Sequence, residues 1–283
     1  MRRRYTFSIF YFQFSILYFL TIIMKKDTSW NNVSDWYDEL LTGSETYQAK
    51  VILPNLLRLV APKKGMKILD LACGQGFFSE AFAREGAEVI GVDIAPGLIK
   101  IAKERVRNAK FFISPADKLS FIPDHSIDII IITLAIQNIE NISGVFREVK
   151  RVLALQREGP PAGGKGKMFL VLNHPAFRIP GSSAWGFDEK TKKQYRRIDA
   201  YLSESKHEID MHPGKEGNTK KTVSFHRPFQ VYFKVLANNG LAVSRLEEWT
   251  SHKESGKGPC KEAEDRARKE FPLFLCLEVF PQK

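Results

Sequence analysis

Between residues 67 and 155 the chain alternates short apolar segments with helical segments, and this alternation restricts the fold more than any other feature. The run from Ile127 to Thr133 is almost entirely isoleucine, which is typical of a strand buried on both faces. Strands that alternate with helices predict a doubly wound parallel sheet. The expected strands are 67–71, 88–92, 109–113 and 126–133, and the expected helices are 77–85, 96–107 and 143–155.

The second half of the chain predicts three more strands, at 167–172, 241–250 and 271–280, with a helix at 229–240. No long periodic helix separates the last two strands, so we expect an antiparallel last strand. Residues 176–224 fall outside the alternation, and a polar connection of this length is usually a functional cap or a disordered excursion. We therefore expect an α/β, Rossmann-like doubly wound sheet of seven strands, mostly parallel, with an inserted cap. Helices over 30–60 are expected to precede the sheet in one domain, 25–283.

Residues 1–24 combine three arginines with about twenty largely apolar residues, roughly the length that spans a bilayer. A membrane anchor through residues 5–24 is one interpretation. A signal peptide is disfavoured because no small-residue cleavage site follows. We favour an upstream extension of the reading frame with the start at Met24, because the polar and aromatic content suits a membrane span poorly.

The formal net charge is +11, but five of these charges belong to Arg2, Arg3, Arg4, Lys25 and Lys26. The remaining charge of +6 is a weak indication of nucleic-acid binding, so a nucleic-acid partner is not expected. The three cysteines form no C-x-x-C pair, which argues against a disulfide framework and a cysteine zinc site. We expect a cytoplasmic protein without a metal.

Two glycines, Gly74 and Gly76, follow the first strand where a helix begins. Glycine lets a backbone approach a ligand closely because no Cβ stands in the way. The dinucleotide fingerprint G-x-G-x-x-G is incomplete, since Ser79 occupies its third position. Acidic residues come at or after the ends of three successive strands, namely Asp70, Asp93 and Asp117. The carboxyl ends of parallel strands form the crevice in which open α/β sheets bind ligands, and a carboxylate after the second strand can accept ribose hydroxyls.

Several segments together resemble the class I S-adenosylmethionine-dependent methyltransferases, and in particular their type 11-like domain. Ile-Leu-Asp-Leu-Ala-Cys-Gly-Gln-Gly resembles motif I, Val-Ile-Gly-Val-Asp-Ile-Ala-Pro motif II and Ser-Pro-Ala-Asp the third motif. Ser-Ile-Asp-Ile-Ile-Ile-Ile-Thr-Leu-Ala resembles motif IV. The similarity covers roughly residues 36–175.

The resemblance implies S-adenosylmethionine as cofactor and a role for each matching position. Asp70, Ala72 and the Gly74–Gly76 backbone would hold the methionine part, and Asp93 the ribose. Ile94 would pack on the adenine, Ala116 and Asp117 would lie near its amino group, and Leu134 would line the methyl end. Related enzymes often carry a histidine where this chain has Asn138, so the identity of any catalytic base is open.

The sequence gives fewer indications of the residues that bind the methyl acceptor, the molecule that receives the methyl group. His174 follows the fifth strand, where it is either a substrate contact or base, or a loop histidine bonded to backbone. Tyr37, Trp185, His226 and Arg227 are candidate substrate-binding residues, with packing as the alternative for each. We expect methyl transfer to an unidentified small molecule. The alternatives are an RNA or protein methyltransferase and a non-catalytic module that only binds S-adenosylmethionine.

Overall fold

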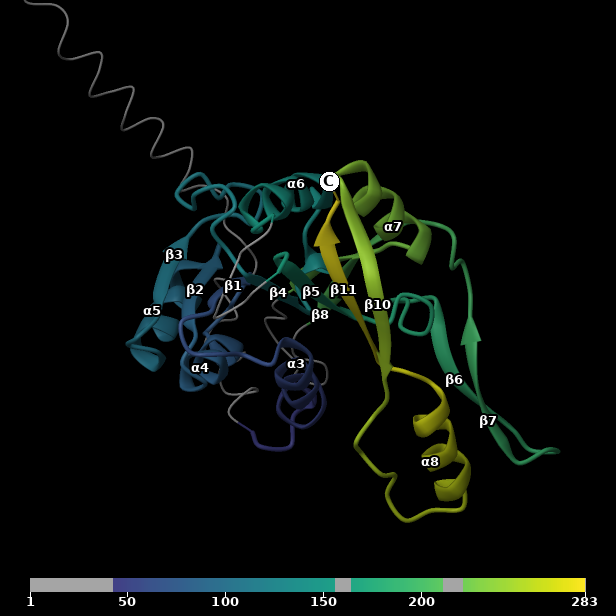
Figure 1. Cartoon of the computed structure of the whole chain (residues 1–283). Coiled ribbons are helices and arrows are strands. Elements are labelled where there is room, and N and C mark those ends of the chain that lie inside the picture. Colours follow the sequence, from purple (N-terminus) through teal and green to yellow (C-terminus); the bar gives the residue numbers. More distant parts are fainter. Residues whose placement is uncertain (1–42, 156–163, 211–220, 283) are drawn as a thin grey trace, which may run out of the picture.

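The computed structural model describes residues 43–155, 164–210 and 221–282. Seven strands form one sheet in the order β10-β11-β5-β4-β1-β2-β3 (Figure 1). All neighbouring pairs are parallel except those of β11, which runs antiparallel to both β5 and β10. This confirms the predicted doubly wound sheet and its antiparallel last strand. The strands are β1 (Lys67–Leu71), β2 (Glu88–Asp93), β3 (Lys110–Ile113), β4 (Ile129–Thr133), β5 (Lys167–Asn173), β10 (Leu241–Trp249) and β11 (Phe274–Pro281).

Helices cover both faces of the sheet and bury a separate apolar core on each side (Figure 1). Successive strand residues point to opposite faces, so Leu69 joins one core and Ile68 the other. The core with Leu69 contains side chains of α6 (Ile142–Val152) and α7 (Phe229–Asn238). The core with Ile68 packs against a helical turn, η2 (Gln48–Ile52), and against α3 (Leu53–Val60), α4 (Phe77–Arg84) and α5 (Pro96–Arg105).

Two β-hairpins occupy most of the described part of 176–224, the block in which no strand was predicted. They are β6–β7 (Ser183–Asp188 with Lys193–Ile198) and β8–β9 (Ser205–Asp210 with Lys221–His226). Both sides of each hairpin stay partly exposed. The strands therefore lack the alternation of apolar and polar residues by which a half-buried strand is recognised.

A helix between the last two strands was also missed. Helix α8 (Lys261–Glu270) is almost entirely charged, and Ala267 is its one buried residue. It lies beside the β6–β7 hairpin, away from the main sheet (Figure 1). Without an apolar stripe the sequence carried no helical period to detect.

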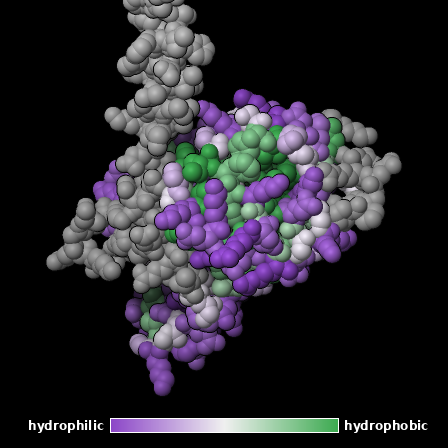
Figure 2. Space-filling model, turned by 90° about the vertical axis from the view of Figure 1, so that its left-hand side faces the viewer, coloured by the Kyte–Doolittle hydropathy of each residue, from purple (hydrophilic) through white to green (hydrophobic). Residues whose placement is uncertain are grey.

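The opposite edge of the sheet is β3, and it carries exposed apolar side chains. Phe112 stacks on Phe121 with 4.6 Å between ring centroids, and Ile113 beside them is 56% exposed. Figure 2 views this side of the molecule and shows apolar surface gathered within a mostly hydrophilic face. The opposite edge strand, β10, exposes Ser244, Arg245 and Leu246 in its middle and so mixes polar with apolar surface.

The N-terminal expectations are only partly within the described residues. Residues 1–24 and Tyr37 lie outside them, and of the helices expected over 30–60 the structure describes η2 and α3. Pro54 stands at the second position of α3, close to the junction with η2. Within the described ranges, none of the helices combines the length and apolar character needed to cross a membrane.

Candidate cofactor site

The candidate site lies where the strand order reverses. From β1 the chain continues to β2 and β3 on one side, whereas β4 and β5 lie on the other side of β1. A ligand in an open α/β sheet binds outside the carboxyl ends of the strands at such a switch point. The predicted cofactor residues follow β1, β2, β3 and β4 at this edge, so the topology brings these strand ends together.

The turn after β1 has an unusual backbone. Ala72, Gly74 and Gly76 all have left-handed conformations, with φ of 61°, 55° and 80°. Alanine rarely adopts this conformation, and such strained residues cluster at functional sites. A Cβ added to Gly76 would come within 3.1 Å of the Ala102 side chain, so the turn packs closely against α5. The three left-handed residues and the close contact with α5 therefore define one specific conformation of the turn after β1.

Asp93 ends β2 and fixes this turn. Its Oδ2 accepts a hydrogen bond from the Gly74 N–H, and its Oδ1 accepts one from the Ala95 N–H, both at 2.9 Å. A carboxylate oxygen has two acceptor positions. Each oxygen thus retains one for a ligand hydroxyl. Burial raises the pKa of Asp93, while these backbone N–H groups oppose that effect.

Asp70 lies at the carboxyl end of β1 and is buried, with 1% of its surface exposed. Its Oδ2 accepts a 2.6 Å hydrogen bond from the Ser79 hydroxyl of α4. Burial, with a smaller contribution from the negative charge of Asp93, raises the pKa of Asp70 to about 7. Ser79, noted in the sequence only as the residue that breaks a glycine pattern, is the partner of this carboxyl group.

The end of β4 contributes a second strained position. Leu134 has a φ of 53° and packs against the core formed with α3, α4 and α5. Its carbonyl accepts a 2.7 Å hydrogen bond from Gln137 Nε2, while Gln137 Oε1 and the hydroxyl of Thr133 have no partner in the described part of the chain. Strained backbone therefore lies on both sides of the switch point, after β1 and after β4.

The positions after β2 and β3 are more accessible. Ile94 and Ala116 are half-buried. Asp117 accepts a 2.8 Å hydrogen bond from Asn141 Nδ2, and Asn141 Oδ1 in turn caps α6 by accepting from the Gly144 N–H. Asp117 thus has a structural task, the support of a helix N-terminus, beside any contact with a ligand.

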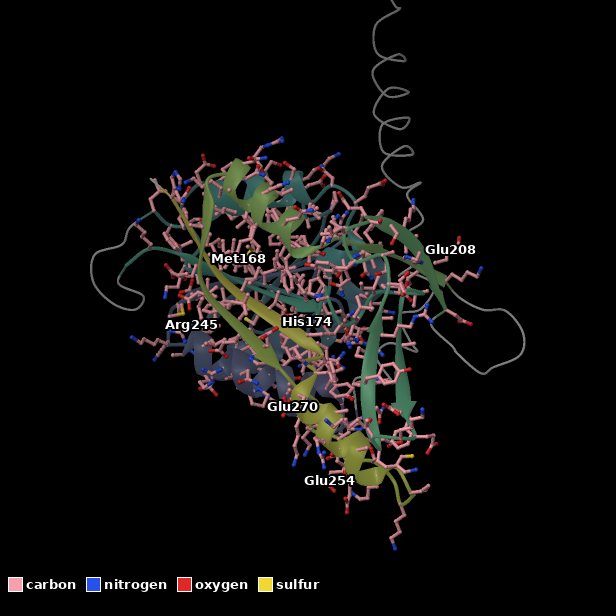
Figure 3. All side chains as sticks on the ribbon, turned by 90° about the vertical axis from the view of Figure 1, so that its right-hand side faces the viewer. Met168, His174, Glu208, Arg245, Glu254 and Glu270 are labelled. Carbon is pink, nitrogen blue, oxygen red and sulfur yellow. The ribbon has the colours of Figure 1, made fainter. Side chains whose placement is uncertain are left out.

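The structure places His174 in a buried cluster after β5, with 1% of its surface exposed (Figure 3). Its Nε2 lies 2.7 Å from Glu248 Oε1, and its Nδ1 accepts from the N–H groups of Ala176 and Phe177 at 3.3 Å each. These contacts place the proton on Nε2. Burial lowers the pKa of His174, partly offset by Glu248. Both ring nitrogens of His174 therefore form hydrogen bonds within the protein.

The other predicted acceptor residues do not form one group. His226 and Arg227 are buried, and they bond backbone carbonyls: His226 Nε2 lies 2.8 Å from the Tyr201 carbonyl, and Arg227 Nη2 donates to the carbonyls of Ile139 and Glu140. Trp185 lies elsewhere, on β6, facing a separate cavity. Candidate metal sites are absent from the parts of the chain that the structure covers.

A switch-point site with a glycine turn and two buried carboxylates has the arrangement in which open α/β sheets bind nucleotide ligands. Residues 69–156 match the protein family described as "Methyltransferase domain". The part of the chain that holds the site thus matches a methyltransferase domain, as the motifs predicted, and the cofactor that those motifs imply is S-adenosylmethionine. The residues fit this cofactor, because the shaped turn and the partly free carboxylate oxygens suit the backbone approach and the hydroxyl groups of a nucleoside.

Known proteins agree with this assignment. A demethylmenaquinone methyltransferase of Staphylococcus aureus is 30% identical over 128 residues, which are 43% of this chain and 53% of that enzyme. An uncharacterized protein of Haemophilus influenzae is 23% identical over 77% of this chain and 81% of its own length. The chain thus spans about half the length of the characterised relative.

Two solved structures share the fold. An S-adenosylmethionine-dependent methyltransferase from Mesorhizobium loti aligns with a TM-score of 0.61 at 24% identity, covering 80% of this chain and 96% of that one. One described as a putative methyltransferase of the same kind, from Listeria monocytogenes, aligns with a TM-score of 0.62 at 20% identity, covering 82% and 98%. Both alignments extend well beyond residues 69–156, so the likeness of fold includes strands of the second half.

Proposed function

We propose that this protein transfers a methyl group from S-adenosylmethionine to a small-molecule acceptor. The observation that carries the proposal is the geometry of Asp93. Two backbone N–H groups hold its carboxylate at the switch point and leave one acceptor position on each oxygen. A pair of acceptors fixed in this way is suited to the two hydroxyl groups of a ribose.

The remaining cofactor residues follow from the same arrangement. Asp70 and the turn over Ala72, Gly74 and Gly76 would hold the methionine part. Ile94 would contact the adenine ring, with Ala116 and Asp117 beside its amino group. Leu134 would line the methyl end, where its strained backbone lies next to the switch point.

The cofactor, when bound, supplies a methyl group already activated on a sulfonium. The acceptor atom forms a bond to that methyl carbon as the carbon–sulfur bond breaks, and the sulfur keeps the electron pair. The protein then accelerates the reaction mainly by alignment and by exclusion of water. A base is needed only if the acceptor must lose a proton. For His174 to act as that base, its ring must give up a contact of Nδ1 or Nε2.

A small acceptor is supported by two observations. The Staphylococcus aureus relative is named for demethylmenaquinone, a small molecule. The hairpins β6–β7 and β8–β9 follow β5 in a long connection of the kind that often serves as a lid or binding segment, which is consistent with the expected cap. We place the reaction in the cytoplasm, which suits three cysteines without disulfides.

The test combines cofactor binding with turnover. Calorimetry should show S-adenosylmethionine binding to the full chain, and Asp93→Asn should weaken it at least tenfold, since a charge-assisted hydrogen bond contributes about 1.5–3 kcal/mol. The matched control is Glu88→Gln, which removes an exposed carboxylate at the other end of β2. Unchanged affinity in Asp93→Asn would refute the ribose assignment.

Turnover is measured with labelled S-adenosylmethionine and a pool of small metabolites. Labelled product together with S-adenosylhomocysteine supports the proposed activity. Binding without transfer to metabolites, RNA or protein would instead indicate a non-catalytic module. Transfer confined to RNA, with salt-dependent RNA binding, would indicate the nucleic-acid alternative.

A further inference from the structure

A cavity of about 240 Å³ opens between the β6–β7 hairpin, α8 and the residues that follow β5. Three arginines line it from three separate segments: Arg178 after β5, Arg196 on β7 and Arg268 on α8. In Figure 3 the hairpin and α8 lie side by side below His174. The cavity is smaller than the pockets of about 300–1,000 Å³ that enclose drug-sized ligands. It therefore suits a small molecule or one end of a larger one.

The three arginines bond only neutral groups in the described part of the chain. Arg178 Nη1 donates to Asn173 Oδ1 at 2.6 Å, Arg196 donates to the Phe177 carbonyl and the Ser183 hydroxyl, and Arg268 Nε donates to the Ser255 hydroxyl. No carboxylate forms an ion pair with any of them there. Desolvation by the surrounding protein lowers the pKa of Arg178, and the positive charge of Arg196 lowers it further. The Arg178 side chain nevertheless remains exposed to solvent. Within the described residues, no ion pair neutralises their positive charge.

Aromatic rings form the apolar part of the same cavity. Phe271 packs edge-on against both Trp185 and Phe177, with ring centroids 5.3 and 5.5 Å apart. The guanidinium of Arg196 lies 5.1 Å from the centre of the Trp185 ring, yet Trp185 remains 42% exposed. An exposed ring fixed by its neighbours offers a stacking surface to a flat apolar ligand.

The cavity opens at the same edge of the sheet as the cofactor site. Arg178 follows the carboxyl end of β5, and Phe271 precedes the start of β11, which pairs with that end of β5. β5 and β11 lie two and three strands from β1. At about 4.8 Å per strand, this is a separation on the order of 10–15 Å along the edge. A ligand held at the arginines can therefore extend toward the methyl end at β4.

We infer that this cavity binds the anionic end of the methyl acceptor, and that the acceptor is a small molecule with a flat apolar body and a carboxylate or phosphate group. The planar guanidinium matches both anions, since it presents paired N–H donors. The anion lies far from the reacting atom, where its binding energy serves to orient the acceptor. This inference rests on the proposed methyltransferase function and identifies the substrate class of that site.

The test measures binding of three probes by ligand-observed NMR titration of the full chain with S-adenosylhomocysteine present. The probes are benzoate, phenyl phosphate and the neutral benzamide. We expect one or both anions to bind at least tenfold more tightly than benzamide, and which of them binds tells carboxylate from phosphate. Arg196→Gln and Arg268→Gln should each weaken the anion about tenfold. Arg197→Gln, on the exposed side of the same hairpin strand, should leave binding unchanged.

Equal binding of benzamide and the anions to the wild type overturns the inference without any variant, so a folding defect in a variant cannot obscure the result. Anion binding that all three arginine variants weaken equally would also overturn it, because Arg197 faces away from the cavity. Calorimetry of S-adenosylmethionine on the same proteins, prepared without S-adenosylhomocysteine, separates the two proposals. If the cofactor binds while the anions show no preference, the inference fails and the methyltransferase function stands. If the cofactor does not bind, the methyltransferase function itself fails.

Discussion

Asp70 makes the stability of the cofactor-free protein depend on pH in a direction opposite to that of an ordinary paired carboxylate. Its carboxyl group has a pKa of about 7 in the folded chain, against an ordinary value of 3.8, because burial penalises the charged form. A folded pKa above the unfolded one favours the native state at low pH. That advantage is lost as the pH rises from about 4 to about 7, because the folded state must then either stay protonated or bury a charge.

The magnitude follows from the two pKa values. One pKa unit corresponds to ~1.36 kcal/mol, so the change from 3.8 to about 7 corresponds to a loss of ~4 kcal/mol across the full range. This is a large part of the 5–15 kcal/mol that is typical of a folded domain. Asp70→Asn removes the ionisation but keeps an oxygen that can accept from the Ser79 hydroxyl.

The assay is urea unfolding of the cofactor-free protein at several pH values between 5 and 8. The unfolding free energy of the wild type should fall relative to that of Asp70→Asn by a few kcal/mol as the pH increases. Glu88→Gln, which removes an exposed carboxylate, should follow the wild type. Parallel pH profiles for wild type and Asp70→Asn would refute the reasoning, because they would mean that the folded state does not resist ionisation of Asp70.

Two other substitutions test the site and its support. Gly74→Val should abolish measurable S-adenosylmethionine binding and destabilise the fold by about 1–3 kcal/mol, because valine is strained at a φ of 55°; Gly256→Val, in open space, should do neither. Retained calorimetric binding in Gly74→Val would contradict a close backbone approach. Asn141→Ala should lower the unfolding free energy by about 1 kcal/mol, since it removes the cap of α6. An unchanged urea midpoint would show that water replaces this cap.

The sequence by itself determined the central sheet. Strands β1 and β4 are buried on both faces, so their residues form nearly continuous apolar runs that can be recognised without a structure. The glycine turn and Asp93 could also be recognised in the sequence, for a related reason. Their chemistry is local, because the strained backbone at Gly74 and the carboxylate at the end of β2 each occupy a fixed place in a strand-to-helix connection.

Only the tertiary structure decided the acceptor side. Arg178, Arg196 and Arg268 are separated by up to ninety residues, and no periodicity links them. The hairpin and α8 that carry two of them bury little apolar surface, so hydrophobic patterning gave no signal for either element. His174 is a second example in which the sequence does not reveal the contact partner. Its position after β5 left open a substrate contact or base and a loop histidine bonded to backbone, whereas its partner Glu248 is supplied by β10, seventy-four residues further along the chain. Local spacing predicts strands and turns because they form from neighbouring residues, but partners brought together by chain folding are decided by packing.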